Sequence, residues 1–242
     1  MKYLVTFGCS HTNGSMLDGI NGSSEYNIRN GFSGMIAKKY GYTLVNISKP
    51  GGSNRYIHRS VVDYINNEIK SNCKYLFLVN WTSKTRMELR YAEDSRHRHI
   101  TLGDYVDQKS VPFTVGSKAS LFSDKAVARL CRLTPYLMNL EKDSNEWAAM
   151  AYGLQQVFKR NNINYLMSNT CEELNITEYN KSICDKLDKK YYIDPFDRSQ
   201  AMVEYLLDLG IEKTPCWHFR EDGHKLWAEK LEKRLLELGH VR

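Results

Sequence analysis

The chain has 242 residues, of which 42% are hydrophobic, so it is long enough for one large domain or two small ones with a proper core. No apolar run approaches the ~20 residues that cross a bilayer, and the N-terminus lacks a signal-peptide pattern. The net charge of +6 is spread among nearly as many acids, which favours a solvated surface over a nucleic-acid-binding stripe. Six scattered cysteines without a C-x-x-C pair indicate reduced thiols rather than a disulfide framework or a zinc site.

Short apolar runs predict the strands of a sheet. Residues 3–7 form the first run, which stops at Gly8, and residues 42–47 form the second. The third, K-Y-L-F-L-V-N-W at residues 74–81, is the most apolar and implies a strand buried on both faces, as in a parallel sheet. Residues 163–167 predict a fourth strand and residues 191–193 a short fifth.

Helical patterns fall between these runs. Ser53 is placed to cap a helix with apolar residues at every fourth position, and further helices are predicted at residues 32–40, 121–140, 145–158, 202–209 and 221–238. The alternation predicts one domain over residues 1–242, a three-layer α/β/α sandwich with a mostly parallel sheet of about five strands. Residues 82–118 are polar and charged, and we expect a functional or mobile loop there.

Ser10 is the first candidate for chemistry. It follows the first strand after Gly8, at the carboxyl edge where open α/β sheets hold their ligands. A serine needs a base to take its proton, and two histidines near the C-terminus, His218 and His224 in W-H-F-R-E-D-G-H, compete for that role. The predicted helix already contains His224, which favours His218 as the base and His224 as a packed helix residue.

Four segments resemble the blocks of the SGNH (GDSL-like) hydrolase family, in the right order over residues 2–229. F-G-C-S-H-T resembles the first block, V-N-I-S-K-P-G the second and H-F-R-E-D-G-H the last, while L-F-L-V-N-W-T-S occupies the place of the third. The continuation W-T-S-K-T-R-M-E resembles tailed-phage members. The resemblance implies an SGNH/flavodoxin-like fold, Ser10 as nucleophile and His218 as base. It also implies an oxyanion hole formed by the amides of Ser10 and Gly51 with Asn80 or Thr82.

Three positions depart from the family pattern. Cys9 replaces the acid beside the serine, and the asparagine of the third block is missing from its expected place. Pro215 stands where the triad acid is expected, so we expect a main-chain carbonyl, a water or an acid from elsewhere behind the imidazole. Because a carbonyl stabilises imidazolium poorly, these departures predict a slow enzyme.

The function implied by the resemblance is that of a serine esterase or deacetylase on an ester, with acetylated carbohydrate among the candidate substrates. Arg86, Trp81 and Asn54 are candidates for substrate contact. We expect no metal and no cofactor, since no phosphate-binding glycine motif is present and R-H-R-H at residues 96–99 is a poor cation site.

The alternative is a weak or inactive binding protein on the same fold, recognising a glycan, a partner protein or nucleic acid. A membrane partner is not expected. The location expected is the cytoplasm, or a virion or the host cytoplasm if the chain is phage-encoded.

Overall fold

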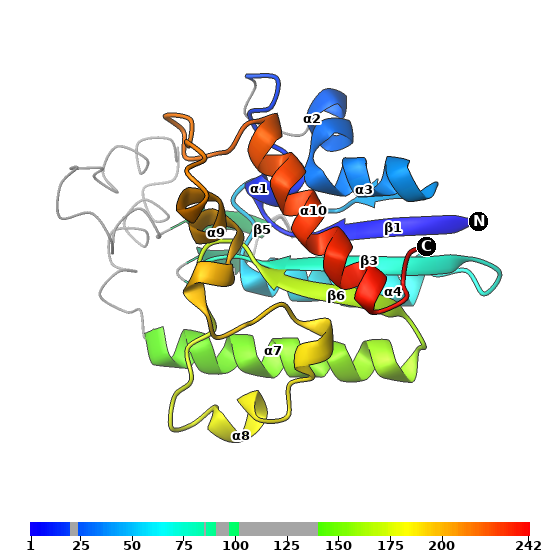
Figure 1. Ribbon diagram of the computed structural model, residues 1–242. Coiled ribbons are helices and arrows are strands. Elements are labelled where there is room, and N and C mark those ends of the chain that lie inside the picture. The colour runs from blue at the N-terminus through cyan, green and yellow to red at the C-terminus, as the bar shows by residue number, and fades with distance from the viewer. Residues whose placement is uncertain (20–23, 85, 91–96, 102–139) are drawn as a thin grey trace.

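The structure is a computed structural model, and it describes residues 1–19, 24–84, 86–90, 97–101 and 140–242 (Figure 1). At its centre is a parallel sheet of four strands in the order β2-β1-β3-β6. The strands are β1 (Lys2–Phe7), β2 (Thr43–Asn46), β3 (Lys74–Trp81) and β6 (Asn164–Asn169). The parallel sheet confirms the predicted fold class.

The predicted fifth strand is reduced to one parallel bridge between Met167 and Tyr192. The residues before it form a short 3-10 helix, Lys189–Tyr191, in which the Asp188 side chain accepts a hydrogen bond from the Lys190 amide. This local cap holds the chain in a turn until Tyr192, so only one residue reaches the sheet edge.

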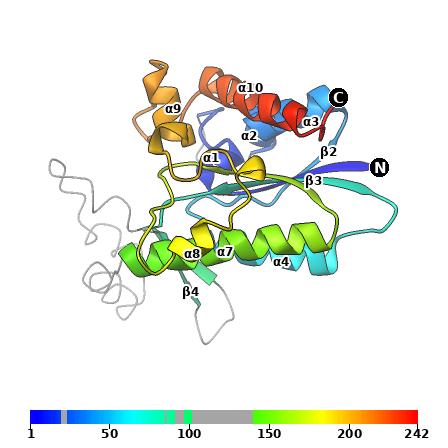
Figure 2. The same ribbon diagram turned by 60° about the horizontal axis from the view of Figure 1, so that its bottom comes forward.

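Alternating residues of the central strands form two cores. Val5, Phe7, Phe77 and Val79 face α4 (Asn54–Asn67) and α7 (Leu140–Arg160). Leu4, Leu76, Leu78 and Leu166 face α3 (Phe32–Tyr40) and α10 (Glu221–Glu237) on the other side. Figure 2 shows these two helical layers on opposite faces of the sheet. Burial on both faces explains why the third apolar run is nearly continuous.

The remaining described helices are short. They are α1 (Ser10–Asn13), α2 (Glu25–Asn30), α8 (Lys181–Cys184), α9 (Met202–Asp208) and the 3-10 turn Arg198–Gln200. Ser53 caps α4 as predicted, its side chain accepting a hydrogen bond from the Tyr56 amide at 3.2 Å. The helix expected at residues 121–140 lies outside the described residues, except for its last position, where α7 begins.

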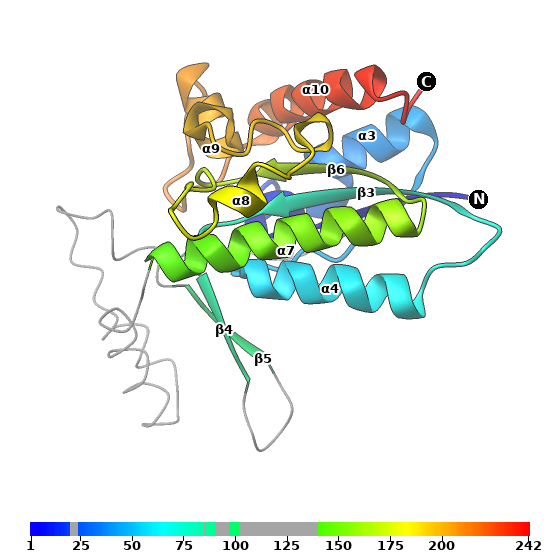
Figure 3. The ribbon, with the colours of Figure 1, turned by 90° about the horizontal axis from the view of Figure 1, so that it is seen from below.

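Part of the segment expected to be a loop is an antiparallel hairpin, β4 (Arg86–Arg90) with β5 (His97–Thr101). Its first strand, R-M-E-L-R, alternates polar and apolar residues, which is the period of a strand with one covered face. Figure 3 shows the hairpin projecting from the side of the molecule covered by α4 and α7. The loop prediction is therefore wrong for these residues, and 102–118 lie outside the described part.

The strand order places a switch point at β1. The first crossover carries the chain from β1 to β2 on one side, and the next carries it back to β3 on the other. Loops diverge at such a point and leave room for a ligand at the carboxyl ends of the strands. Helix α1 follows β1 at this end, whereas both chain termini lie at the opposite end (Figure 1).

Gly223→Ala tests how α10 is seated. A Cβ at Gly223 would lie 2.7 Å from Cβ of Phe219, a core residue with no exposed surface, so we expect a loss of ~1–3 kcal/mol of unfolding free energy from overpacking. Gly153→Ala in α7 is the matched control, because a Cβ there meets no atom within 4 Å, and it should gain ~0.5–1 kcal/mol of helix propensity. Urea unfolding measures the free energy of unfolding of both variants. Equal free energies for Gly223→Ala and Gly153→Ala would contradict the packing of Gly223 against Phe219.

Candidate active site

Ser10 is the first residue of α1 and lies directly beyond the end of β1. Its side chain is mostly buried, with 7% of the residue exposed. A Cβ at Gly8 would lie 2.1 Å from the Thr12 hydroxyl oxygen, so glycine is what lets the chain fold back from β1 into α1. The glycine of the first block therefore fixes where the serine is presented.

His218 lies in the loop between α9 and α10, and the residue that follows Ser10 contacts it. The rings of His11 and His218 are 4.8 Å apart between centroids. Cys9 acts on His218 electrostatically and raises its pKa. The structure thus brings the end of β1 and the loop before α10 together, while the pairing of Ser10 with His218 stays a prediction. His11 itself had no predicted role, although it stands in the first block.

Thr214 holds the main chain of His218 in place. The Thr214 amide and hydroxyl both donate to the His218 carbonyl, at 2.8 and 2.9 Å. The His218 amide donates in turn to the Thr214 hydroxyl at 3.2 Å. Phe219, the next residue, is fully buried in the core. The base candidate is therefore fixed from both sides of its backbone.

Burial lowers the pKa of His218, and the Arg86 guanidinium acts in the same direction. The Cys9 charge and the Cys216 carbonyl oppose that shift. Neither ring nitrogen of His218 makes a hydrogen bond of regular geometry to another described residue, so the Cys216 carbonyl acts as a nearby dipole. It is the kind of main-chain group expected in place of the acid missing at Pro215.

His224 has a structural environment. It is 1% exposed, its ring stacks on Phe32 at 5.8 Å, and its Nδ1 accepts a hydrogen bond from the Phe32 amide at 3.3 Å. Burial lowers the pKa of His224 to about 4. The side chain fastens α10 to the start of α3, which agrees with its prediction as a packed helix residue.

The second block forms a tight turn against the end of β1. Its central residues are Pro50 and Gly51, and the Gly52 amide donates to the Lys49 carbonyl at 2.9 Å. Gly51 has φ of 74°, the left-handed conformation that this turn position requires. The Lys49 amide donates to the Gly8 carbonyl at 3.1 Å, which ties the turn to the segment that carries Ser10. The amides of Ser10 and Gly51 donate no hydrogen bond within the described part of the chain.

The third block is engaged in structural contacts. Asn80 donates to the Phe7 carbonyl at 3.4 Å and accepts from the Ser168 hydroxyl at 2.7 Å, so its amide joins three strands. The Asn54 side chain forms a reciprocal pair with the main chain of Thr82, at 2.8 and 3.1 Å. These bonds use the amide groups that were candidates for oxyanion or substrate contact.

Trp81 has no exposed surface, and its indole packs on Trp147 with ring centroids 6.5 Å apart. The prediction that Trp81 contacts substrate is therefore not supported, because Trp81 is a core residue. Its strand is buried on both faces, so the side chains on both sides of the strand are hidden from solvent. The Thr82 hydroxyl lies 3.9 Å from the Cys171 sulfur.

A thiol pair that sequence reasoning missed lies beside Ser10. Cys9 and Cys171 interact, and this contact with Cys171, helped by Arg86 and His11, lowers the pKa of the buried Cys9 thiol well below its usual range. Arg86, which was expected to contact substrate, lowers the pKa values of Cys9, His11 and His218 through its positive charge. The pairing joins residues 162 positions apart, which no local pattern reveals.

A groove of about 380 Å³ lies elsewhere, between α3 and α10, and contains neither Ser10 nor His218. Its lining includes Lys39 and Glu232, whose ion pair at 2.5 Å joins the two helices. We assign this groove to helix packing. Among the described residues no group of three His, Cys, Asp or Glu side chains is arranged to hold a metal ion, and no helix is long and apolar enough to cross a membrane.

His224→Gln tests the burial of this imidazole through pH. Its pKa is about 4 in the folded chain against an ordinary 6.5, so the unfolded chain binds more protons between these pH values, and the free energy of unfolding falls as the pH is lowered through that window. Urea unfolding at several pH values from 7 to 4 should give a slope for His224→Gln that is smaller by up to about 1.4 kcal/mol per pH unit. Parallel slopes for the two proteins would show that His224 titrates normally.

No family model matches the sequence, and no curated protein matches it. Solved structures share its fold. A family two carbohydrate esterase from Clostridium thermocellum, in complex with cellohexaose, has a TM-score of 0.50 at 13% identity, over 98% of this chain and 65% of that one. The esterase EstA from Pseudoalteromonas sp. has a TM-score of 0.49 at 9% identity, over 98% of each chain.

The acetylxylan esterase Axe2 from Geobacillus stearothermophilus, a catalytic mutant, has a TM-score of 0.48 at 12% identity, over 96% of this chain and 93% of that one. A lipolytic protein of the G-D-S-L family from Veillonella parvula has a TM-score of 0.44 at 11% identity, over 98% of this chain and 97% of that one. Such identities show the fold alone, and the tailed-phage resemblance stays a prediction. The chain thus has a three-layer α/β/α fold with a parallel sheet, a fold that it shares with this family two carbohydrate esterase.

Proposed function

We propose that the chain is a serine hydrolase of the esterase type, with Ser10 as nucleophile and His218 as base. The observation that carries the proposal is that the ring of His11, the residue directly after Ser10, lies 4.8 Å from the ring of His218 between centroids. Ser10 also stands at the switch point of the sheet, where this class of fold binds ligands.

The proposed reaction has two halves. In the first, His218 takes the proton of the Ser10 hydroxyl while its oxygen attacks the ester carbonyl, and the proton then passes to the leaving alkoxide. In the second, water attacks the acyl-serine with His218 again as base, and Ser10 is released. Burial keeps the pKa of His218 below 6.5, so the imidazole is neutral and able to accept a proton at pH 7.

The oxyanion that forms in each half is stabilised by main-chain amides. Those of Ser10 and Gly51 lie on two segments joined by the Lys49–Gly8 hydrogen bond, and neither amide is used within the described chain. The Thr82 hydroxyl is the proposed third donor. One such donor contributes ~3 kcal/mol of transition-state stabilisation.

The proposed enzyme is a slow one. Among the groups that shift the pKa of His218, no carboxylate of the described residues appears, and Cys9 and the Cys216 carbonyl are the groups that raise this pKa against the effect of burial. A triad acid fixes the tautomer and stabilises the charge together. Here the Thr214 hydrogen bonds fix the backbone of His218, while the positive charge of the imidazolium is less well stabilised than it would be by a carboxylate.

An acetylated carbohydrate is the substrate class that we propose. The support is the likeness in fold to a carbohydrate esterase solved with cellohexaose. A cytoplasmic setting is proposed as well, because the five described cysteines are free thiols.

The missing carboxylate also supports a second function, an inactive binding protein that recognises a glycan on the same fold. The two differ in the reactivity of Ser10. A binding protein would take up the glycan without reacting with an electrophile directed at serine, whereas a hydrolase would lose its nucleophile to such a reagent.

Ser10→Ala and His218→Ala test the proposed pair. Ser10→Ala should abolish hydrolysis of a short p-nitrophenyl ester with a nearly unchanged melting temperature, because a small side chain is lost at a single position. His218→Ala should lower kcat by ~10³ or more, on the scale of losing the base of a Ser–His pair. Activity of Ser10→Ala at the wild-type level would show that the nucleophile is assigned wrongly.

Thr214→Val tests the clamp on the base. Valine keeps the shape of threonine but removes the hydroxyl that bonds both the carbonyl and the amide of His218. We expect kcat to fall by ~10-fold or more, since small misplacements of a catalytic group are costly. Thr214→Ser is the matched control, because it keeps the hydroxyl and should retain most of the activity. Similar rates for the two variants would contradict a positioning role.

A further inference from the structure

Trp217 is the one tryptophan exposed to solvent, and it stands directly before His218. The chain has four tryptophans, and Trp81, Trp147 and Trp227 are at most 1% exposed, whereas Trp217 is 62% exposed. Its φ of 68° is left-handed, which is unusual for so bulky a residue. Strained backbone of this kind is retained where the surroundings impose it, most often at functional sites.

The surroundings of Trp217 do impose it. The Trp217 amide donates to the Thr214 carbonyl at 2.8 Å, and the next residue is held by the Thr214 hydroxyl. Phe219 then anchors the loop in the core. The indole is not part of that anchoring, because it remains mostly in solvent. The strain at Trp217 is therefore not offset by burying its indole, which stays in solvent one residue before the proposed base.

A cation fixes the direction of the ring. Nζ of Lys213 lies 4.0 Å from the centre of the Trp217 ring, within the range of a cation–π contact. Burial lowers the pKa of Lys213, so the ammonium is partly removed from water where it meets the ring. With the ammonium over one face of the indole, stacking would use the other face, and a ring that carries hydroxyl groups suits the pair because its C–H groups can stack while a hydroxyl at its rim accepts a hydrogen bond from the ammonium. An acyl chain would gain nothing from the ammonium.

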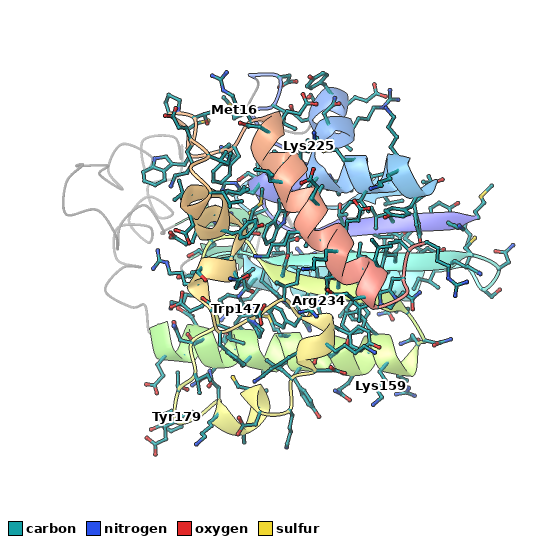
Figure 4. The ribbon with its side chains drawn as sticks, viewed as in Figure 1. Met16, Trp147, Lys159, Tyr179, Lys225 and Arg234 are labelled. Carbon is teal, nitrogen blue, oxygen red and sulfur yellow. The ribbon has the colours of Figure 1, made fainter. Side chains whose placement is uncertain are left out.

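A second left-handed residue lies at the same end of the molecule. Met16, with φ of 75°, follows α1 and is partly exposed. Figure 4 shows Met16 at the end where α10 begins, whereas Tyr179, another exposed aromatic residue, lies far from it beside α8. Non-glycine strain thus occurs on both the segment that follows Ser10 and the loop that carries His218.

We propose that Trp217, with Lys213, is a stacking platform for a saccharide ring next to the ester that Ser10 attacks. This rests on the proposed function, since it names the part of the substrate that the site holds besides the ester. Trp217 would be a specificity-determining residue, selecting esters of saccharides over small esters of other alcohols.

The first test needs no variant of the platform and no turnover. In the Ser10→Ala protein, a xylo- or cello-oligosaccharide should change tryptophan fluorescence saturably and protect it from iodide, because Trp217 is the only indole open to solvent. No protection at saturating oligosaccharide would overturn the proposal. Such a failure differs from failure of the proposed function, which would appear as activity that survives Ser10→Ala.

The second test separates the ring from the strain. Trp217→Asn removes the ring while asparagine tolerates the left-handed conformation, and Trp217→Tyr keeps an aromatic face. In the Ser10→Ala background, calorimetry should show oligosaccharide affinity about tenfold weaker with Trp217→Asn and nearly retained with Trp217→Tyr. Melting curves should show both variants folded. Equal affinity with and without the aromatic ring would overturn the platform.

The third test measures specificity in the active protein. The ratio of kcat/KM for an acetylated oligosaccharide to that for p-nitrophenyl acetate should fall about tenfold in Trp217→Asn. Tyr179→Asn is the matched control, since Tyr179 is 71% exposed but lies on the far side of the molecule, and its ratio should not change (Figure 4). A ratio that Trp217→Asn leaves unchanged would contradict the assignment of Trp217 to saccharide binding.

Discussion

The contact between the end of β1 and the loop before α10 is the constraint on which the site depends. These segments are about 200 residues apart in sequence, and they meet through the rings of His11 and His218, 4.8 Å apart. The contact requires α10 to be seated correctly on the sheet. His224 secures it by its hydrogen bond and stacking on Phe32, and Phe219 secures it by burial next to Gly223. Packing of one helix thus sets the geometry of the proposed catalytic pair.

In the proposed site, the base has no carboxylate of the described residues behind it. In a full triad, one acid both orients the imidazole and balances its charge. Here the two tasks are divided: Thr214 fixes the backbone of His218 by hydrogen bonds, while the Cys9 charge and the Cys216 carbonyl raise its pKa against the effect of burial. The hydrogen bonds to Thr214 hold the backbone of His218 in one position. Whether Cys9 carries a charge depends instead on its neighbours Cys171 and Arg86, which lower its pKa.

Much of the fold could be predicted because strands buried on both faces leave a continuous apolar signal. Residues 74–81 show this signal, and the helices that cover them were predicted from the spacing of their apolar residues and from the capping residue Ser53. The hairpin Arg86–Arg90 with His97–Thr101 was missed because its signal is a five-residue alternation inside a charged segment. Trp81 was misjudged because a residue's place in a motif does not tell on which side of the strand its side chain lies.

The candidate site was predictable only in part. Motif order led to the proposal of Ser10 and His218, which stays a prediction, and the turn at Gly51 follows from its Pro-Gly sequence. The hydrogen bonds from Thr214 and the Cys9–Cys171 contact depend on loops that meet only in the folded chain, so no spacing rule reveals them. His11 was visible in the first block, but its role appears only when the His218 ring is found beside it.

The central claim is that Ser10 is activated by His218, and labelling by a fluorophosphonate tests it most directly. The intact protein would be treated with the reagent, digested and analysed by mass spectrometry, beside the His218→Ala variant. The account predicts a single phosphonyl adduct on Ser10 in the wild-type protein and little or none in the variant, because the hydroxyl is a weak nucleophile without its base. An unmodified Ser10 in folded wild-type protein, or equal labelling in the variant, would contradict the account.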